Sequence, residues 1–147
     1  MAEAKSKLKI LFLCTGNSCR SQIAEGWARH LKSNIIEPFS AGTKIRGLDP
    51  RAVKVMAEEG VDISRHRSKT VAEWPDLEFD FVITVCSDAD RNCPVFPGGA
   101  IKIHRGFDDP PRLAKNARTE EEALGHYRRV RDEIRDFIQT LPESLIE

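Results

Sequence analysis

The chain has 147 residues, of which 40% are hydrophobic and 31% are charged, and its formal net charge is zero. This length is typical of one domain, so we expect residues 1–147 to form a single domain. A balanced charge provides no basic field for nucleic acid, and no apolar run approaches the ~20 residues that cross a bilayer, which excludes nucleic acid and membrane as expected partners.

Strand and helix patterns alternate along the chain. A short apolar run predicts a buried strand over residues 7–13, and apolar residues at helical spacing predict a helix over residues 21–32. A strand over 36–40 and a helix from Pro50 to Gly60 follow, with Asp49 as the N-cap. Further strands are predicted over 79–85 and 101–104, then an irregular surface loop over 108–118 and a long C-terminal helix that begins after Thr119. This alternation predicts an α/β fold: a single three-layer sandwich with a small, mainly parallel four-stranded sheet.

The loop after the first strand has the composition of an oxyanion site. Residues 14–21 read Cys-Thr-Gly-Asn-Ser-Cys-Arg-Ser and lie between a predicted strand and a predicted helix. Gly16 and Asn17 allow positive φ angles, which turn backbone N–H groups inward, and the helix N-terminus adds further unpaired N–H groups. Arg20 supplies a planar guanidinium suited to a tetrahedral anion. Such an environment also stabilises a thiolate at Cys14. The remaining candidate binding residues of this loop are Thr15, Ser18, Cys19 and Ser21.

Four cysteines occur, at positions 14, 19, 86 and 93. Because the N-terminus lacks the pattern of a signal peptide, we expect a cytoplasmic protein, in which cysteines are catalytic, redox-active or simply buried. The C-x4-C and C-x6-C spacings differ from the C-x2-C pairs of structural zinc sites, so no metal is predicted. Taken singly, Cys86 fits a buried residue at the end of a strand, and Cys93 fits a loop thiol.

The motif CTGNSCRSQIAEG resembles the active-site loop of the low-molecular-weight protein tyrosine phosphatase superfamily. The resemblance continues in order through residues 39–42, 49–50 and 62–66 and covers essentially the whole chain. It implies that Cys14 is a nucleophile and that Arg20 binds the oxyanion. It also implies that Asn17 holds the shape of the loop and that Ser21 hydrogen-bonds the thiolate.

Two further segments, residues 85–94 and 104–110, resemble the thioredoxin-coupled arsenate reductases, a branch on the same fold. The resemblance implies arsenate as substrate, with phosphate or sulfate as competing oxyanions, and Asp109 as the general acid. It implies a disulfide relay from Cys14 through Cys86 to Cys93, which thioredoxin reduces as an external donor. Cys19 is given no redox role, no bound cofactor is implied, and we expect a monomer.

Two other functions remain open. One is a low-molecular-weight tyrosine phosphatase whose extra cysteines only protect the nucleophile, and the other is a phosphate-binding module without catalysis. Phosphatases of this family carry aromatic residues after the Asp-Pro pair, whereas Pro111 and Arg112 follow it here, so the grip on a substrate ring is missing. An intact nucleophile and acid argue against the binding module.

The relay requires a conformational change. Seven residue steps separate Cys86 from Cys93, which span ~10 Å in a helix at about 1.5 Å per residue. A disulfide requires Cα atoms about 4.4–6.8 Å apart. We therefore expect residues 86–97 to change conformation between the reduced and oxidised proteins.

Some reductases that this chain resembles bind a monovalent cation through residues matching Asn17, Glu25 and Ser40. In this chain, Arg67 and Lys69 stand at two further positions of that site. Since a cation is repelled by fixed positive charges, we expect the Lys69 ammonium to replace the metal ion.

Overall fold

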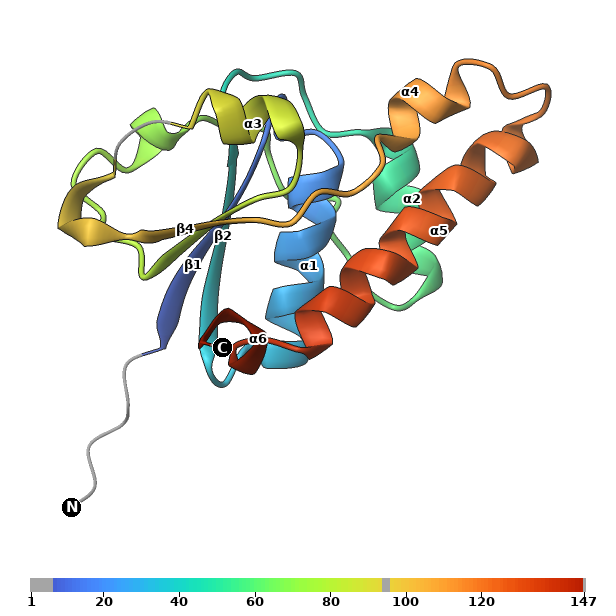
Figure 1. Cartoon of the computed structure of the whole chain (residues 1–147). Coiled ribbons are helices and arrows are strands. Elements are labelled where there is room, and N and C mark those ends of the chain that lie inside the picture. The colour runs from blue at the N-terminus through green and yellow to red at the C-terminus, as the bar shows by residue number, and fades with distance from the viewer. Residues whose placement is uncertain (1–6, 94–95, 147) are drawn as a thin grey trace.

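The sheet has four strands, all parallel, in a computed structural model that describes residues 7–93 and 96–146. The strands are β1 (Leu8–Cys14), β2 (Ile36–Gly42), β3 (Phe81–Thr84) and β4 (Ile101–His104), in the order β2-β1-β3-β4 (Figure 1). This confirms the predicted α/β fold, although β3 is shorter than expected. The signal-peptide prediction falls largely on residues 1–6, and the predicted conformational change includes residues 94–95; both stretches lie outside the described residues.

Six helices are described. They are α1 (Arg20–Lys32), α2 (Pro50–Glu58), α3 (Ser87–Arg91), α4 (Pro110–Ala114), α5 (Glu120–Gln139) and α6 (Glu143–Ile146), with short 3-10 turns over Val71–Glu73 and Pro97–Gly99. The prediction of an irregular loop over 108–118 is wrong, because α4 lies within it. Pro110 occupies the first helical position, where its fixed φ favours a helix start, and α4 packs against α5. In the described part of the chain, no helix combines the length and the apolar character that crossing a membrane requires.

The main core lies between the sheet and the helices on one of its faces. Strand β1 is buried from Ile10 to Cys14, and α1 packs on both β1 and β2 while α5 packs on α1 (Figure 1). Trp27 is 3% exposed, and its indole N–H donates to the carbonyl of Arg131 at 3.1 Å, which joins α1 to α5. These contacts hold α1 between the sheet and α5.

Aromatic side chains form a cluster around one residue of β2. Phe39 of β2 meets Trp74 and Phe79 edge to face, with ring centroids 5.2 and 5.3 Å apart, and Phe79 meets Phe96 at 5.9 Å. Such pairs contribute beyond their buried area. The cluster therefore fixes the connection over residues 70–79. This connection directly follows Ser68 and Lys69, which hydrogen-bond to the loop after β1.

We predict that Tyr127→Phe lowers the free energy of unfolding by about 1.5–3 kcal/mol, the usual worth of a hydrogen bond to a charged group. The Tyr127 hydroxyl donates to Asp49 Oδ2 at 2.6 Å, and Asp49 Oδ1 caps α2 by accepting from the N–H of Arg51. Burial, together with the Asp49 carboxylate, raises the pKa of Tyr127, so the hydroxyl remains a donor at neutral pH.

Urea denaturation measures this loss. The control Ser33→Ala removes an exposed hydroxyl at the end of α1 and is expected to change stability by less than about 0.5 kcal/mol. Equal effects of the two substitutions would contradict the prediction.

Candidate active site

The loop of residues 14–20 runs from the last residue of β1 to the first residue of α1, at the edge of the sheet where the strands end (Figure 1). Four of its carbonyl groups accept hydrogen bonds from the segment 43–49: Cys14 from Thr43 (3.1 Å), Thr15 from Lys44 (3.0 Å), Gly16 from Arg46 (3.1 Å) and Ser18 from Asp49 (3.1 Å). In a planar trans peptide the N–H points away from the carbonyl. Because these carbonyls bond to the segment 43–49, the peptide planes turn their N–H groups in the opposite direction, toward the inside of the loop.

Asn17 and Gly42 give the loop its shape. Asn17 is fully buried with φ of 47°, the left-handed conformation that the sequence predicted for this turn. A side chain at Gly42 would place its Cβ 2.6 Å from the nitrogen of Asn17 and 2.7 Å from the carbonyl oxygen of Thr15. Glycine is thus required where β2 approaches the loop.

Gly16 has a different role from the one predicted. It does not adopt a positive φ, but a Cβ there would lie 2.6–2.9 Å from the Cδ, Cγ and Cβ atoms of Arg46. The absence of a side chain at Gly16 therefore lets the Arg46 side chain pack across the loop.

A chain of hydrogen bonds orients the sulfur of Cys14. The N–H of Lys69 donates to Asn17 Oδ1 at 2.9 Å, which fixes the Asn17 amide so that its Nδ2 donates to Ser21 Oγ at 2.8 Å. The Ser21 proton is then free to point at Cys14 Sγ, 2.9 Å away. Cys14 is 3% exposed, so this donor acts in a site with little water. The Ser21 hydroxyl can therefore donate a hydrogen bond to the sulfur of Cys14.

The side chains of Arg20 and Asp109 are neighbours in the site. Arg20 Nη1 donates to the carbonyl of Phe107 at 2.9 Å, and its Nη2 lies 3.8 Å from Asp109 Oδ1. Asp109 is the N-cap residue of α4, but its carboxylate makes no capping hydrogen bond and its side chain is 40% exposed. The carboxyl group is therefore available to exchange a proton with a bound molecule.

Cys86 lies close to the loop through Thr15. Cys86 Sγ is 3.3 Å from Thr15 Oγ1, whose proton is donated to Asp88 Oδ2 at 3.1 Å. The sulfur also accepts from the N–H of Ala89 at 3.4 Å and so caps α3. The residue that follows Cys14 in the chain thus contacts the second predicted redox cysteine.

The other two cysteines differ in accessibility. Cys19 is the N-cap residue of α1 and is 4% exposed; burial, then the charge of Asp49, raises the pKa of its thiol well above the usual value. Burial therefore favours the neutral thiol at Cys19. Cys93 is half-buried, and burial followed by the charge of Asp90 raises its pKa against the opposing charge of Lys102.

A cavity of about 530 Å³ opens over the loop. Its lining brings together the predicted residues Cys14, Arg20 and Asp109 with the loop residues Thr15, Gly16, Ser18 and Cys19. It also includes residues that sequence analysis did not assign to the site: Lys44, Arg46, Asp49, Asp88 and Pro111. The sequence marked Asp49 only as a helix cap, Asp88 only as part of the segment 85–94, and Pro111 only as the residue after the Asp-Pro pair, and it gave no signal for Lys44 or Arg46. Among the described residues, Cys86 and Cys93 do not line this cavity, and no aromatic residue does.

We predict that Ser21→Ala slows alkylation of Cys14 by iodoacetamide at pH 6 about tenfold, because the thiolate loses a charge-assisted hydrogen bond. Mass spectrometry of the alkylated peptide measures the rate. Ser33→Ala, at the exposed end of α1, is the control and should leave the rate unchanged. An unaltered rate in Ser21→Ala would show that the hydroxyl does not stabilise the sulfur anion.

Comparison with known proteins agrees with this geometry. Residues 9–147 match the family described as low molecular weight phosphotyrosine protein phosphatase. The chain is 48% identical to an arsenate reductase of Bacillus licheniformis, over 95% of this chain and 98% of the relative, and 44% identical to one of Bacillus subtilis, over 92% and 95%.

Two solved structures illustrate the same likeness. One is an arsenate reductase in a phosphate-binding state, with a TM-score of 0.72 and 29% identity, over 91% of this chain and 95% of the other. The second is a low molecular weight protein tyrosine phosphatase from T. tengcongensis, with a TM-score of 0.74 and 26% identity, over 94% and 99%. The chain belongs to the low molecular weight phosphotyrosine protein phosphatase family.

Proposed function

We propose that this protein is an arsenate reductase that passes the oxidation from Cys14 through Cys86 to Cys93. Reduction of arsenate is supported by the relatives at 48% and 44% identity, which are arsenate reductases. The contact that carries the proposal is the 3.3 Å between Cys86 Sγ and Thr15 Oγ1, because Thr15 follows Cys14 directly. A second sulfur therefore lies next to the oxyanion loop.

The first step forms a bond between sulfur and arsenic. Arsenate has the charge and shape of phosphate, so the inward N–H groups and Arg20 bind it and stabilise the charge that develops. The Cys14 thiolate attacks arsenic, and one arsenate oxygen leaves as water after Asp109 donates a proton to it. Phosphate and sulfate compete for the same donors. The product is a Cys14–arsenic adduct in which arsenic is still pentavalent.

The second step reduces arsenic. The sulfur of Cys86 attacks the sulfur of Cys14, the sulfur–arsenic bond breaks, and its electron pair stays on arsenic. Arsenic becomes trivalent and leaves as arsenite, while the two sulfurs lose two electrons and form a disulfide. Thr15 holds Cys86 near the loop for this attack, and Asp88 orients Thr15.

The third step moves the disulfide outward. Cys93 attacks Cys86, which releases Cys14 as a thiolate and leaves a Cys86–Cys93 disulfide. Residues 87–91 are helical, and Asn92 is the C-cap of this helix. In the proposed step, α3 unwinds so that the Cα atoms of Cys86 and Cys93 come within about 4.4–6.8 Å of each other, as a disulfide requires. An external dithiol, thioredoxin, then reduces the outer disulfide and returns two electrons. The chain itself needs no resident cofactor.

The phosphatase alternative shares the loop and the acid. Its family model matches residues 9–147, so hydrolysis of small phosphate esters is expected as a side activity. The cavity lining lacks an aromatic residue to grip a tyrosine ring, in the part of the chain that is described. This favours a small inorganic oxyanion over a phosphotyrosine side chain.

We predict that Cys86→Ser abolishes arsenate turnover, by roughly 100-fold or more, and leaves hydrolysis of p-nitrophenyl phosphate intact, because only reduction needs the second sulfur. Turnover is followed as NADPH consumption with thioredoxin and thioredoxin reductase. Cys14→Ser should abolish both activities. Arsenate turnover that survives in Cys86→Ser would end the relay proposal.

We predict that formation of the Cys86–Cys93 disulfide accelerates as pH rises from about 7 to 9, approaching tenfold per pH unit. The raised pKa of Cys93 keeps it a thiol near neutrality, and only the thiolate attacks. Acid quenching of a single turnover, followed by mass spectrometry, measures this step.

Lys102→Ala should slow the same step at pH 7, since the positive charge of Lys102 lowers the pKa of Cys93. Lys115→Ala, an exposed lysine at the end of α4, is the matched control. A pH-independent rate would contradict the assignment of Cys93 as the attacking group.

A further inference from the structure

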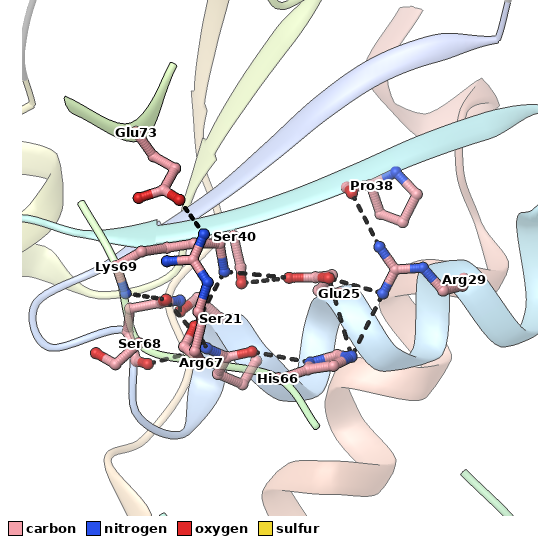
Figure 2. A network of polar contacts seen from close by, with 12 residues as sticks. Ser21, Glu25, Arg29, Pro38, Ser40, His66, Arg67, Ser68, Lys69 and Glu73 are labelled. Atoms are coloured by element: carbon pink, nitrogen blue, oxygen red, sulfur yellow. Dashed lines mark hydrogen bonds and ion pairs between the residues drawn. The ribbon is translucent and has the colours of Figure 1, made fainter. Parts of the chain in front are cut away.

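A buried carboxylate lies one helical turn beyond Ser21. The side chain of Glu25 on α1 is 9% exposed, accepts a hydrogen bond from the hydroxyl of Ser40, and accepts another from Arg29 Nη1 at 2.7 Å. Lys69 Nζ lies 3.9 Å from the Oε1 atom that accepts from Ser40 (Figure 2). A buried carboxylate requires such compensation by positive charge.

The Lys69 ammonium is enclosed on several sides. Its side chain is 12% exposed, its Nζ donates to the carbonyl of Arg67 at 3.1 Å, and it lies 5.8 Å from the centre of the Trp74 ring. Figure 2 shows Lys69 pointing toward Glu25 and Ser40, while Arg67 turns away to pair with Glu73. The ammonium, not the neighbouring guanidinium, therefore faces the buried carboxylate.

His66 adds no competing positive charge here. Its Nδ1 lies 2.9 Å from Gln22 Oε1, and Gln22 Nε2 donates to Asn17, so Nδ1 carries the proton and Nε2 is bare. Burial lowers the pKa of His66, although the charge of Glu25 opposes this shift. Burial therefore favours the neutral ring, although His66 Nε2 lies 3.9 Å from Glu25 Oε2, and the charged partners of Glu25 are Lys69 and Arg29.

These contacts do not fit a bound monovalent metal ion. The oxygens that would surround it are already used: Asn17 Oδ1 accepts from the N–H of Lys69, and the carbonyl of Arg67 and the carboxylate of Glu25 face the Lys69 ammonium. An added cation would also be repelled by the ammonium at close range. An ammonium group and a potassium ion carry the same charge and have similar size.

We propose that the Lys69 ammonium is the permanent counter-ion of Glu25 and that Lys69 is thereby a positioning residue for Cys14, with no monovalent metal ion at this place. The ion pair fixes the backbone of Lys69, whose N–H holds Asn17 at 2.9 Å and whose carbonyl accepts from Gly42 at 2.8 Å. Asn17 holds Ser21, and Ser21 contacts Cys14. The inference concerns the oxyanion loop and does not depend on the disulfide relay.

The wild-type protein provides the first test. Its melting temperature and the rate of Cys14 alkylation by iodoacetamide at pH 6 are measured in potassium chloride and in choline chloride at equal ionic strength. Both quantities should be the same in the two salts. A potassium-specific rise in either would overturn the proposal, and neither readout requires arsenate reduction.

Variants provide the second test. Lys69→Ala opens a space beside Glu25. Alkylation of Cys14 should slow about tenfold in choline chloride, which corresponds to the loss of one hydrogen bond to a charged group. The rate should recover when potassium or ammonium ions are added. Lys69→Met fills the same space without charge and should be slow in every salt. Lys69→Arg keeps the charge and should remain within about threefold of the wild type.

Lys54→Met, at an exposed position of α2, is the matched control and should behave as the wild type in both salts. Lys69→Ala with a wild-type rate in choline chloride would overturn the positioning role. If Lys69→Ala is slow to the same degree in choline chloride and in potassium chloride, the assignment of Lys69 as the replacement for a small cation is overturned. If Lys69→Ala does not fold, the wild-type salt comparison and Lys69→Arg still decide the question.

Discussion

The site depends on hydrogen bonds that hold the carbonyl groups of residues 14–18 away from the cavity. A short loop cannot offer its N–H groups to an anion unless its carbonyls are bonded elsewhere, because each peptide plane fixes the two in opposite directions. The segment 43–49 supplies these outward partners as it leaves β2. Anion binding by this loop is thus a property of two neighbouring strands and not of the loop sequence alone.

The parallel sheet explains why residues distant in sequence meet at this place. Strands β1 and β3 end side by side, with Leu13 paired to Thr84, so the segments that follow them, with Cys14 and Cys86, are neighbours. Asp109 follows β4 and reaches the same edge through the start of α4. Ligand sites of parallel α/β sheets lie beyond this edge, where each strand contributes one loop.

Much of this was predictable from the sequence. The apolar runs gave β1 and β4 nearly to the residue, and the Cys-Thr-Gly-Asn-Ser-Cys-Arg motif located the loop. Local patterns were insufficient where the decisive contact is distant. Gly16 was expected to supply a turn, but it makes room for the Arg46 side chain, a contact that no local rule contains. Helix α4 was missed because two adjacent prolines are typical of a loop. In the structure, Pro110 occupies the first position of a helix, and packing on α5 stabilises that helix. The roles of Lys44 and Asp88 in the cavity likewise depend on tertiary approach.

The N-cap of α3 is the sulfur of Cys86, so a change at this sulfur also affects the stability of the helix. The sulfur of Cys86 accepts the N–H of Ala89 at the start of a helix of five residues, which is too short to be stable without tertiary support. Any covalent bond made by that sulfur draws it toward its new partner and removes an acceptor from the helix end. In the proposed relay, the Cys14–Cys86 bond would draw this sulfur away from the N–H of Ala89, so that forming the disulfide would itself loosen the start of α3.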